Sequence, residues 1–312
     1  MGYRRRVLAL EPDAHTAARY DVQMSAPAQT LAVGPAGEPW PTLGLGTWRL
    51  GENGRGADRE AALLREAVVC GYRLFDTAEM YGEGGAERVL GQALAQALRE
   101  PGVQREELRI VSKAYPHHGD VAGLRRACDA SRRRLQLETI DLYLLHWRGD
   151  IPLAETVRGF ERLQQKGWIR HWGVSNFDVG DLEELQRVAG AQACAANQVY
   201  YSLSERGVEF DLLPRMRALR MPLMAYSPID GGRILRNAKL AKLAESLNLS
   251  AAQLSLAWLL RQPGVMAIPK AGREPHLFEN WQSRDVTLPQ QVLSELETVF
   301  AKPSRKHPLA MR

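Results

Sequence analysis

The stretch RLFDTAEMYG, residues 73–82, begins as a short apolar run and ends in polar residues with titratable side chains. It predicts a strand over residues 73–77, with Asp76 and Tyr81 at and just beyond its end. Apolar residues then recur at helical spacing over residues 89–97, which predicts a helix. The segment therefore has the pattern of one strand–helix unit with polar side chains at the junction.

The same alternation of an apolar run with an amphipathic stretch continues along the chain. The predicted strands cover residues 44–48, 73–77, 109–113, 141–146, 171–176, 195–199, 223–227 and 265–270. Strands separated by helical segments favour parallel βαβ units. Eight such units without a break in composition predict one α/β domain, a closed (β/α)8 TIM barrel.

Other segments lie outside this repeat. Residues 31–40, with GPAG at their centre, predict an N-terminal β-hairpin that covers the barrel bottom. Extra helices are expected toward the C-terminus, from an added segment over 237–247 and a helix over 289–300, followed by a loop. Residues 1–30 are expected to be a poorly structured tail, with Met24 as the natural start, and residues 31–312 a single domain.

The composition limits the classes of partner. The chain has 312 residues, 45% of them hydrophobic and 25% charged, and a formal net charge of +5. Its basic residues are scattered among acidic ones, so we expect neither a nucleic-acid nor a membrane partner. Cys70, Cys128 and Cys194 form no CxxC pair, which favours free buried thiols in a reducing, cytoplasmic compartment.

Each predicted strand ends in a polar or aromatic residue. In chain order these are Trp48, Asp76, Lys113, His146, Asn176, Gln198, Tyr226 and Lys270. Because the carboxyl ends of barrel strands meet at one mouth, these residues are expected to surround an active site. Taken singly, Lys113 could be a surface strand end, His146 a core histidine and Asp76 a turn cap. His117 and His118 have no suitably spaced third ligand, so no metal site is predicted.

Several segments also carry distinctive motifs in a fixed order. They are LGLGTW (43–48), RLFDTAEMYGEGGAERVLG (73–91), LRIVSKAYPHH (108–118), DLYLLHW (141–147), IRHWGVSNF (169–177), NQVYYSL (197–203), MAYSP (224–228) and IPKAG (268–272). With these motifs the chain resembles the aldo-keto reductase family over about residues 31–300. It is most similar to bacterial reductases of small aldehydes and α-dicarbonyls.

The resemblance implies a catalytic tetrad of Asp76, Tyr81, Lys113 and His146. In this assignment Tyr81 donates a proton to the carbonyl oxygen, which His146 orients. The Lys113 ammonium, held by Asp76, is expected to lower the pKa of the phenol. Lowering that pKa from about 10 to about 7 requires roughly 4 kcal/mol.

The resemblance also implies a nicotinamide cofactor, since no side chain supplies hydride. The residues assigned to its binding are Gly46, Thr47, Trp48, Asp76, Ser175, Asn176, Gln198, Tyr226, Ser227, Pro228, Gly232, Lys270, Arg273, His276, Glu279 and Asn280, the last two against the adenine. Ser175, Asn176 and Gln198 would bond the carboxamide. Tyr226 would stack on the nicotinamide ring.

Two positions depart from the family pattern near the adenosine phosphate. Ala271 stands where many members have Ser, and His276 where they have Arg, the better bidentate phosphate ligand. The predicted preference for NADPH and NADP+ therefore depends on Lys270, aided by Arg273. NADH stays possible.

The substrate is predicted to be a small carbonyl compound. Its expected contacts are Trp48, Tyr81, Tyr115, His146 and Trp147, with Trp40 as a further wall. Trp172 is assigned to packing.

The predicted function is NADP-dependent reduction of small aldehydes or α-dicarbonyls such as methylglyoxal, by a monomer. One alternative is a cofactor-binding regulatory subunit built on the same barrel. Another is a sugar or polyol dehydrogenase that runs the reaction in reverse, because the same residues serve both directions.

Overall fold

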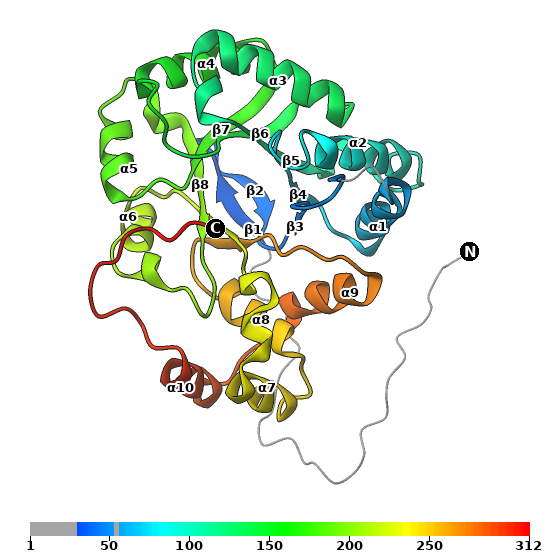
Figure 1. Cartoon of the computed structure of the whole chain (residues 1–312), viewed down its shortest axis with the longest axis vertical. Helices are drawn as coiled ribbons and strands as arrows, with labels where there is room; N and C mark the ends of the chain where they lie inside the picture. The colour runs from blue at the N-terminus through cyan, green and yellow to red at the C-terminus, as the bar shows by residue number, and fades with distance from the viewer. Residues whose placement is uncertain (1–29, 53–55) are drawn as a thin grey trace.

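The computed structural model describes residues 30–52 and 56–312, which form a sheet of eight parallel strands with helices around it (Figure 1). The strands are β3 (Leu45–Gly46), β4 (Leu74–Asp76), β5 (Arg109–Ala114), β6 (Ile140–Leu145), β7 (Ile169–Ser175), β8 (Cys194–Tyr200), β9 (Leu223–Tyr226) and β10 (Val265–Ala267). They neighbour one another in chain order. Each overlaps a predicted strand, so the predicted fold is confirmed.

Main-chain hydrogen bonds between the two outer strands close the sheet into a barrel. The Gly44 N–H donates to Ala267 O at 2.8 Å, and the Gly46 N–H donates to Pro269 O at 3.0 Å. The chains approach closely here, since a Cβ on Gly46 would lie 2.9 Å from the carbonyl oxygen of Ile268. Closure gathers the carboxyl ends of the strands into one ring.

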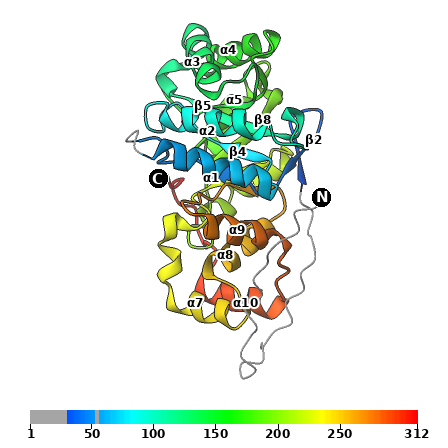
Figure 2. The same cartoon turned by 90° about the vertical axis from the view of Figure 1, so that its right-hand side faces the viewer.

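Helices surround the barrel in both views (Figures 1 and 2). They are α1 (Ala57–Cys70), α2 (Gly85–Ala97), α3 (Val121–Leu135), α4 (Leu153–Gln165), α5 (Val179–Gln186), α6 (Leu212–Ala218), α7 (Ala238–Glu245), α8 (Ala251–Leu260), α9 (Glu274–Gln282) and α10 (Gln290–Val299). α7 and α10 are the predicted extra helices. None of the helices formed by the described residues is long and apolar enough to cross a membrane.

The predicted hairpin pairs β1 (Thr30–Val33) with β2 (Glu38–Pro41), and it lies at the opposite end of the barrel from the end of the chain (Figure 2). Trp40 is fully buried and packs with the interior residues of the barrel, its ring 6.2 Å from that of His171. The prediction that Trp40 lines the substrate site is therefore wrong. The predicted N-terminal tail, apart from Thr30, and the proposed start at Met24 lie outside the described residues.

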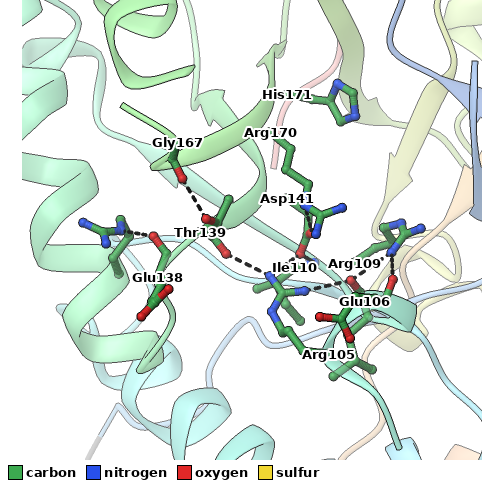
Figure 3. A network of polar contacts seen from close by, with 12 residues as sticks. Arg105, Glu106, Arg109, Ile110, Glu138, Thr139, Asp141, Gly167, Arg170 and His171 are labelled. Atoms are coloured by element: carbon green, nitrogen blue, oxygen red, sulfur yellow. Dashed lines mark hydrogen bonds and ion pairs between the residues drawn. The ribbon is translucent and has the colours of Figure 1, made fainter. Parts of the chain in front are cut away.

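A buried carboxylate joins the amino ends of three strands beneath the barrel (Figure 3). Asp141 Oδ2 accepts hydrogen bonds from Arg105 Nη2 at 2.7 Å and from the Ile110 N–H at 2.9 Å. Its other oxygen lies 3.3 Å from Arg170 Nε. These contacts tie β5, β6 and β7 together at the end away from the mouth.

Alternation along each strand decides which side chains face the barrel interior. Val111 in β5 and Ala196 in β8 belong to the interior apolar cluster, whereas Ile110 packs outward against the helices. Lys113 and Gln198 stand two residues after the interior residues of their strands, so they face inward as well. Both lie within their strands rather than at the ends, because β5 continues to Ala114 and β8 to Tyr200.

The predicted packing of Trp172 and the burial of two of the three cysteines are confirmed. Cys128 and Cys194 are buried, Cys70 is half-buried, and all three are free thiols. Trp172 is fully buried and stacks on Phe160, with ring centroids 5.2 Å apart.

Candidate active site

A cavity of about 360 Å³ opens at the carboxyl end of the barrel. The predicted site residues that line it are Gly46, Trp48, Asp76, Tyr81, His146, Ser175, Asn176, Gln198, Tyr226, Ser227, Pro228, Gly232, Lys270 and His276. They come from the ends of seven of the eight strands, all except β5, and from the segments that follow them. Such a cavity is typical of a site for a small organic ligand.

Lys113 connects the acid and the phenol of the predicted tetrad. Its Nζ donates to Asp76 Oδ2 at 2.8 Å, to Tyr81 Oη at 3.1 Å and to the carbonyl oxygen of Thr77 at 2.9 Å. The other Asp76 oxygen accepts from Gln198 Nε2 at 2.8 Å. Both oxygens of Asp76 thus accept hydrogen bonds, as an ionised carboxylate does beside an ammonium group.

The electrostatics of this trio differ in one respect from the prediction. Burial by itself would lower the pKa of Lys113, but the adjacent Asp76 and Tyr81 raise it, so the ammonium stays charged. Burial raises the pKa of Tyr81, and the attraction of the nearby ammonium does not offset it. The predicted lowering of the Tyr81 pKa is therefore wrong, because the phenol is buried as well as paired with the ammonium.

His146 follows β6 and faces the same cavity. Its ring lies edge-on to that of Tyr81, with centroids 5.8 Å apart. Burial and the nearby Lys113 charge lower its pKa to about 2, so the imidazole is neutral at physiological pH. Its Nδ1 is buried without a hydrogen-bond partner. A neutral imidazole can donate a hydrogen bond to a carbonyl oxygen.

A hydrogen-bonded amide cluster occupies the mouth beside His146. Asn176 follows the end of β7 with a left-handed backbone, φ 58°, and its Nδ2 donates to His146 O at 3.1 Å and to Ser175 Oγ at 3.1 Å. Its Oδ1 accepts from the Tyr226 hydroxyl at 2.9 Å. Burial raises the pKa of Tyr226 to about 12, which keeps this phenol protonated. Asn176 thus joins three strand ends.

Cationic groups lie at another part of the cavity. Lys270 lines it, and burial lowers the pKa of this ammonium. His276 also lines it, and its Nε2 lies 2.9 Å from Arg273 Nη2. His276, which stands where many family members have Arg, is therefore in contact with Arg273, the residue expected to aid Lys270. Asn280 Nδ2 is buried with no hydrogen-bond partner.

Other predicted site residues do not line the cavity. They are Thr47, Lys113, Tyr115, Trp147, Arg273, Glu279 and Asn280. Thr47 is buried, and its hydroxyl donates to Asp76 O at 3.0 Å. Tyr115 and Trp147 meet edge to face with centroids 6.1 Å apart. Direct ligand contacts of these residues stay predictions.

The histidine pair near this loop is held by a carboxylate. His118 Nδ1 lies 2.9 Å from Glu79 Oε1, which also accepts from the Tyr115 N–H at 2.7 Å. Within residues 30–52 and 56–312, no three His, Cys, Asp or Glu side chains gather as a metal site would require. The contact positions the loop that carries Tyr115.

Some cavity residues were not predicted. They are Arg49, Met80, Ile229, Leu235, Ile268 and Arg312. Strand alternation could have indicated Ile268, which lies two residues before Lys270. No local pattern indicates Arg312, since it reaches the site only through the path of the chain after α10.

Comparisons with known proteins agree with this geometry. Residues 42–300 match the family model described as the Aldo/keto reductase family. The chain is 44% identical over 276 residues to the methylglyoxal reductase YeaE of Escherichia coli, covering 87% of this chain and 95% of that protein. It is 35% identical to the glyoxal reductase of Bacillus subtilis, covering 84% of this chain and 88% of that protein.

A solved structure gives the same result. A Klebsiella pneumoniae aldo/keto reductase in complex with NADP and acetate matches with a TM-score of 0.87 and 42% identity, over 92% of this chain and all of that one. The chain belongs to the aldo/keto reductase family, and it is an oxidoreductase that acts on carbonyl groups.

Proposed function

We propose that this protein reduces small aldehydes and α-dicarbonyls, such as methylglyoxal, to alcohols with NADPH. The observation that carries the proposal is the contact of Lys113 Nζ with both Asp76 and Tyr81 beside the cavity at the barrel mouth. The similarity to methylglyoxal and glyoxal reductases supports this substrate class.

The side chains around the cavity fit a nicotinamide dinucleotide. Ser175, Asn176 and Gln198 offer hydroxyl and amide groups at one end, and Lys270 offers a cation at another. The Nδ2 of Asn280 is a buried donor without a hydrogen-bond acceptor. A ring nitrogen of adenine could serve as that acceptor. When bound, the reduced nicotinamide supplies the hydride. The relatives of known structure bound to NADP or NADPH support the choice of cofactor.

The protein's own residues supply the proton and the stabilising charge. Tyr81 is a neutral phenol in this environment, so it has a proton to donate to the carbonyl oxygen. As it donates, the Lys113 ammonium stabilises the developing phenolate, and Asp76 holds that ammonium in place. Neutral His146 orients the carbonyl oxygen by donating a hydrogen bond.

Steady-state oxidation of NADPH with methylglyoxal and simple aromatic aldehydes tests the proposal. Turnover with these carbonyls is expected. Tight NADPH binding without turnover of any small carbonyl would favour the regulatory-subunit alternative. Activity confined to the oxidation of sugars or polyols would favour the dehydrogenase.

Lys270 is proposed to set the preference for NADPH over NADH. Lys270→Met should weaken the binding of NADPH by about 10- to 100-fold while leaving that of NADH nearly unchanged, since one charge-assisted contact is worth about 1.5–3 kcal/mol. Lys242→Met, on the exposed side of α7, is the matched control. Better catalytic efficiency with NADH in the unaltered protein would contradict the cofactor assignment.

We also propose that residues 31–312 form a single domain and that the protein acts as a cytoplasmic monomer without a nucleic-acid partner. The dispersed charge and the free thiols support this. Light scattering coupled to size exclusion tests the oligomeric state, with one protomer per particle as the expected result.

A further inference from the structure

The last residues of the chain cross the molecule to the mouth of the barrel. After α10, residues 301–312, here named the tail, run without a helix or strand past α6 toward the centre of the barrel (Figure 1). Arg206 Nη1 donates to Phe300 O at 2.5 Å where the tail begins, and Lys306 Nζ lies 2.9 Å from Asp211 Oδ2 farther along. These contacts fix the path of the tail before it reaches the site.

Arg312 lies in the cavity at the barrel mouth, here named the cofactor groove. Its side chain lines the cavity, and Nη1 donates to Asp230 Oδ1 at 2.7 Å. Its backbone N–H donates to the Tyr226 hydroxyl at 3.2 Å. A Cβ on Gly231 would lie 2.6 Å from the guanidinium, so the arginine packs directly on the backbone of this glycine. The tail thus contacts the hydroxyl of Tyr226, which is assigned to the nicotinamide, and Gly231, the neighbour of the assigned Gly232.

Asp230 is the group to which the tail is tied. It lies in the loop after β9, and it also accepts hydrogen bonds from the Tyr200 hydroxyl and from Arg233 Nη2, the latter at 2.7 Å. Arg312 and Arg233 therefore share one carboxylate. The Arg312 side chain is 26% exposed and borders the groove, whereas that of Arg233 is 59% exposed and does not line it.

We propose that Arg312 is a cofactor-binding residue that closes the tail over the bound dinucleotide, with Asp230 as its anchor. This inference rests on the proposed function, because it assigns the groove to NADPH. Next to the residue covered by Arg312, Gly232 has a left-handed conformation, φ 86°, and open space before it, so a phosphate can approach its backbone. A guanidinium beside it attracts that phosphate, and its planar set of donors can serve Asp230 and an anion together.

Such closure should slow the release of the cofactor. Once the dinucleotide is in the groove, it is enclosed between the barrel mouth and Arg312, so it leaves only when the ion pair to Asp230 opens. Losing a charge-assisted contact of about 1.5 kcal/mol corresponds to roughly a tenfold change in rate.

The test measures NADPH dissociation by stopped-flow fluorescence, with excess NADP+ as the chase, in three variants. Arg312→Ala should dissociate about tenfold faster than the unaltered protein. Asp230→Asn should also be faster, because it removes the anchor. Arg233→Ala is the matched control, since it removes a guanidinium from the same carboxylate but not from the groove, and it should stay within about twofold. Added salt should speed release from the unaltered protein more than from Arg312→Ala.

Equal release rates for Arg312→Ala and the unaltered protein would overturn the inference while leaving the proposed function intact. An equal acceleration in Arg233→Ala would also overturn it, because the effect would then come from the loop rather than from the tail. Failure of the unaltered protein to bind NADPH at all would overturn the proposed function and this inference together.

Discussion

The two ends of the barrel each hold a buried carboxylate paired with cations, and they differ in what lies beyond the pair. At the amino end, Asp141 is enclosed by Arg105, Arg170 and a backbone N–H, and it does not line the cavity at the mouth (Figure 3). At the carboxyl end, Asp76 pairs with Lys113, and Lys113 also donates a hydrogen bond to the hydroxyl of Tyr81, which lines the cavity. Similar chemistry therefore stabilises the fold at one end and is available for catalysis at the other.

The hairpin accounts for the closed end. Glu38 in β2 lies 2.9 Å from Arg109 Nη2 and 2.9 Å from His171 Nε2, so the hairpin is paired with β5 and β7. Gly34 in its turn has φ 71°, and a Cβ there would lie 2.6 Å from the His171 ring. The turn requires glycine both for its conformation and for this contact. Among residues 30–52 and 56–312, no comparable hairpin covers the mouth, where the tail makes a few polar contacts instead.

The largest expected effect is at the mouth. Tyr81→Phe should reduce kcat/KM for methylglyoxal by about a thousandfold, because general acid catalysis is worth about 10²–10⁴ in rate. The affinity for NADPH, measured by fluorescence titration, should change by less than about threefold.

Tyr72→Phe provides the matched control for that substitution. Its hydroxyl is also buried and donates to Leu277 O at 3.0 Å, but it does not line the cavity. It should change stability by about 1 kcal/mol and leave turnover nearly unaltered. Turnover by Tyr81→Phe at the unaltered rate would remove the proposed proton donor.

At the amino end the expected pattern is reversed. Asp141→Ala should lower the free energy of unfolding by about 2–3 kcal/mol, because it leaves two guanidinium groups and a buried N–H without their acceptor. The kcat/KM of the folded enzyme should change by less than about twofold. Urea denaturation and steady-state kinetics on the same preparation provide the measurement.

Asp129→Ala is the matched control, because it removes a paired carboxylate that lies on the surface instead of one that is buried. Asp129 pairs with Arg133 on the surface of α3, so its loss should cost less than about 1 kcal/mol. A large loss of activity in Asp141→Ala without a loss of stability would mean that the amino end of the barrel also contributes to catalysis.

The histidine at the mouth should make stability depend on pH. His146 has a pKa of about 2 when folded, against about 6.5 in an unfolded chain, so only the unfolded state gains its proton as the pH falls below 6.5. The stability that comes from the neutral ring is present above that pH and is lost by about 1.4 kcal/mol per pH unit below it.

Urea denaturation of the unaltered protein and of His146→Asn between pH 7 and pH 5 checks this expectation. The variant should lose less stability over that range, by about 2 kcal/mol at pH 5. An equal loss of stability in the two proteins between pH 7 and pH 5 would show that His146 gains its proton in the folded state over this range.

The smallest expected effect is at the hairpin. Burial by itself would raise the pKa of Glu38, but the hydrogen bond with His171 and the charge of Arg109 hold it below its ordinary value. Its contribution to stability is therefore present above about pH 4.5 and is lost as the pH falls through the lower folded value. Glu38→Gln should remove roughly 1 kcal/mol or less at pH 7 and nearly nothing at pH 3, measured by urea denaturation.

Much of the fold could be predicted from the sequence because it is encoded locally. The apolar runs and the helical spacing between them located all eight strands. The strand ends were less certain, as Lys113 and Gln198 show, because the last residues of a strand are paired by neighbours that a local pattern does not contain. The wrong placement of Trp40 has the same origin, since an aromatic residue in a hairpin can pack on either end of a barrel.

What the sequence determined by itself was the order of strands and helices and the kinds of chemical groups that follow each strand. A strand period of two also decides which of these groups face inward, once the barrel is closed. Only the tertiary structure decided the pKa of Tyr81, because that value depends on how fully the phenol is enclosed as well as on the charge beside it. Only the tertiary structure placed Arg312 against Asp230, 82 positions away along the chain. Such contacts arise from the path of the chain through space, and no periodic pattern in the sequence records that path.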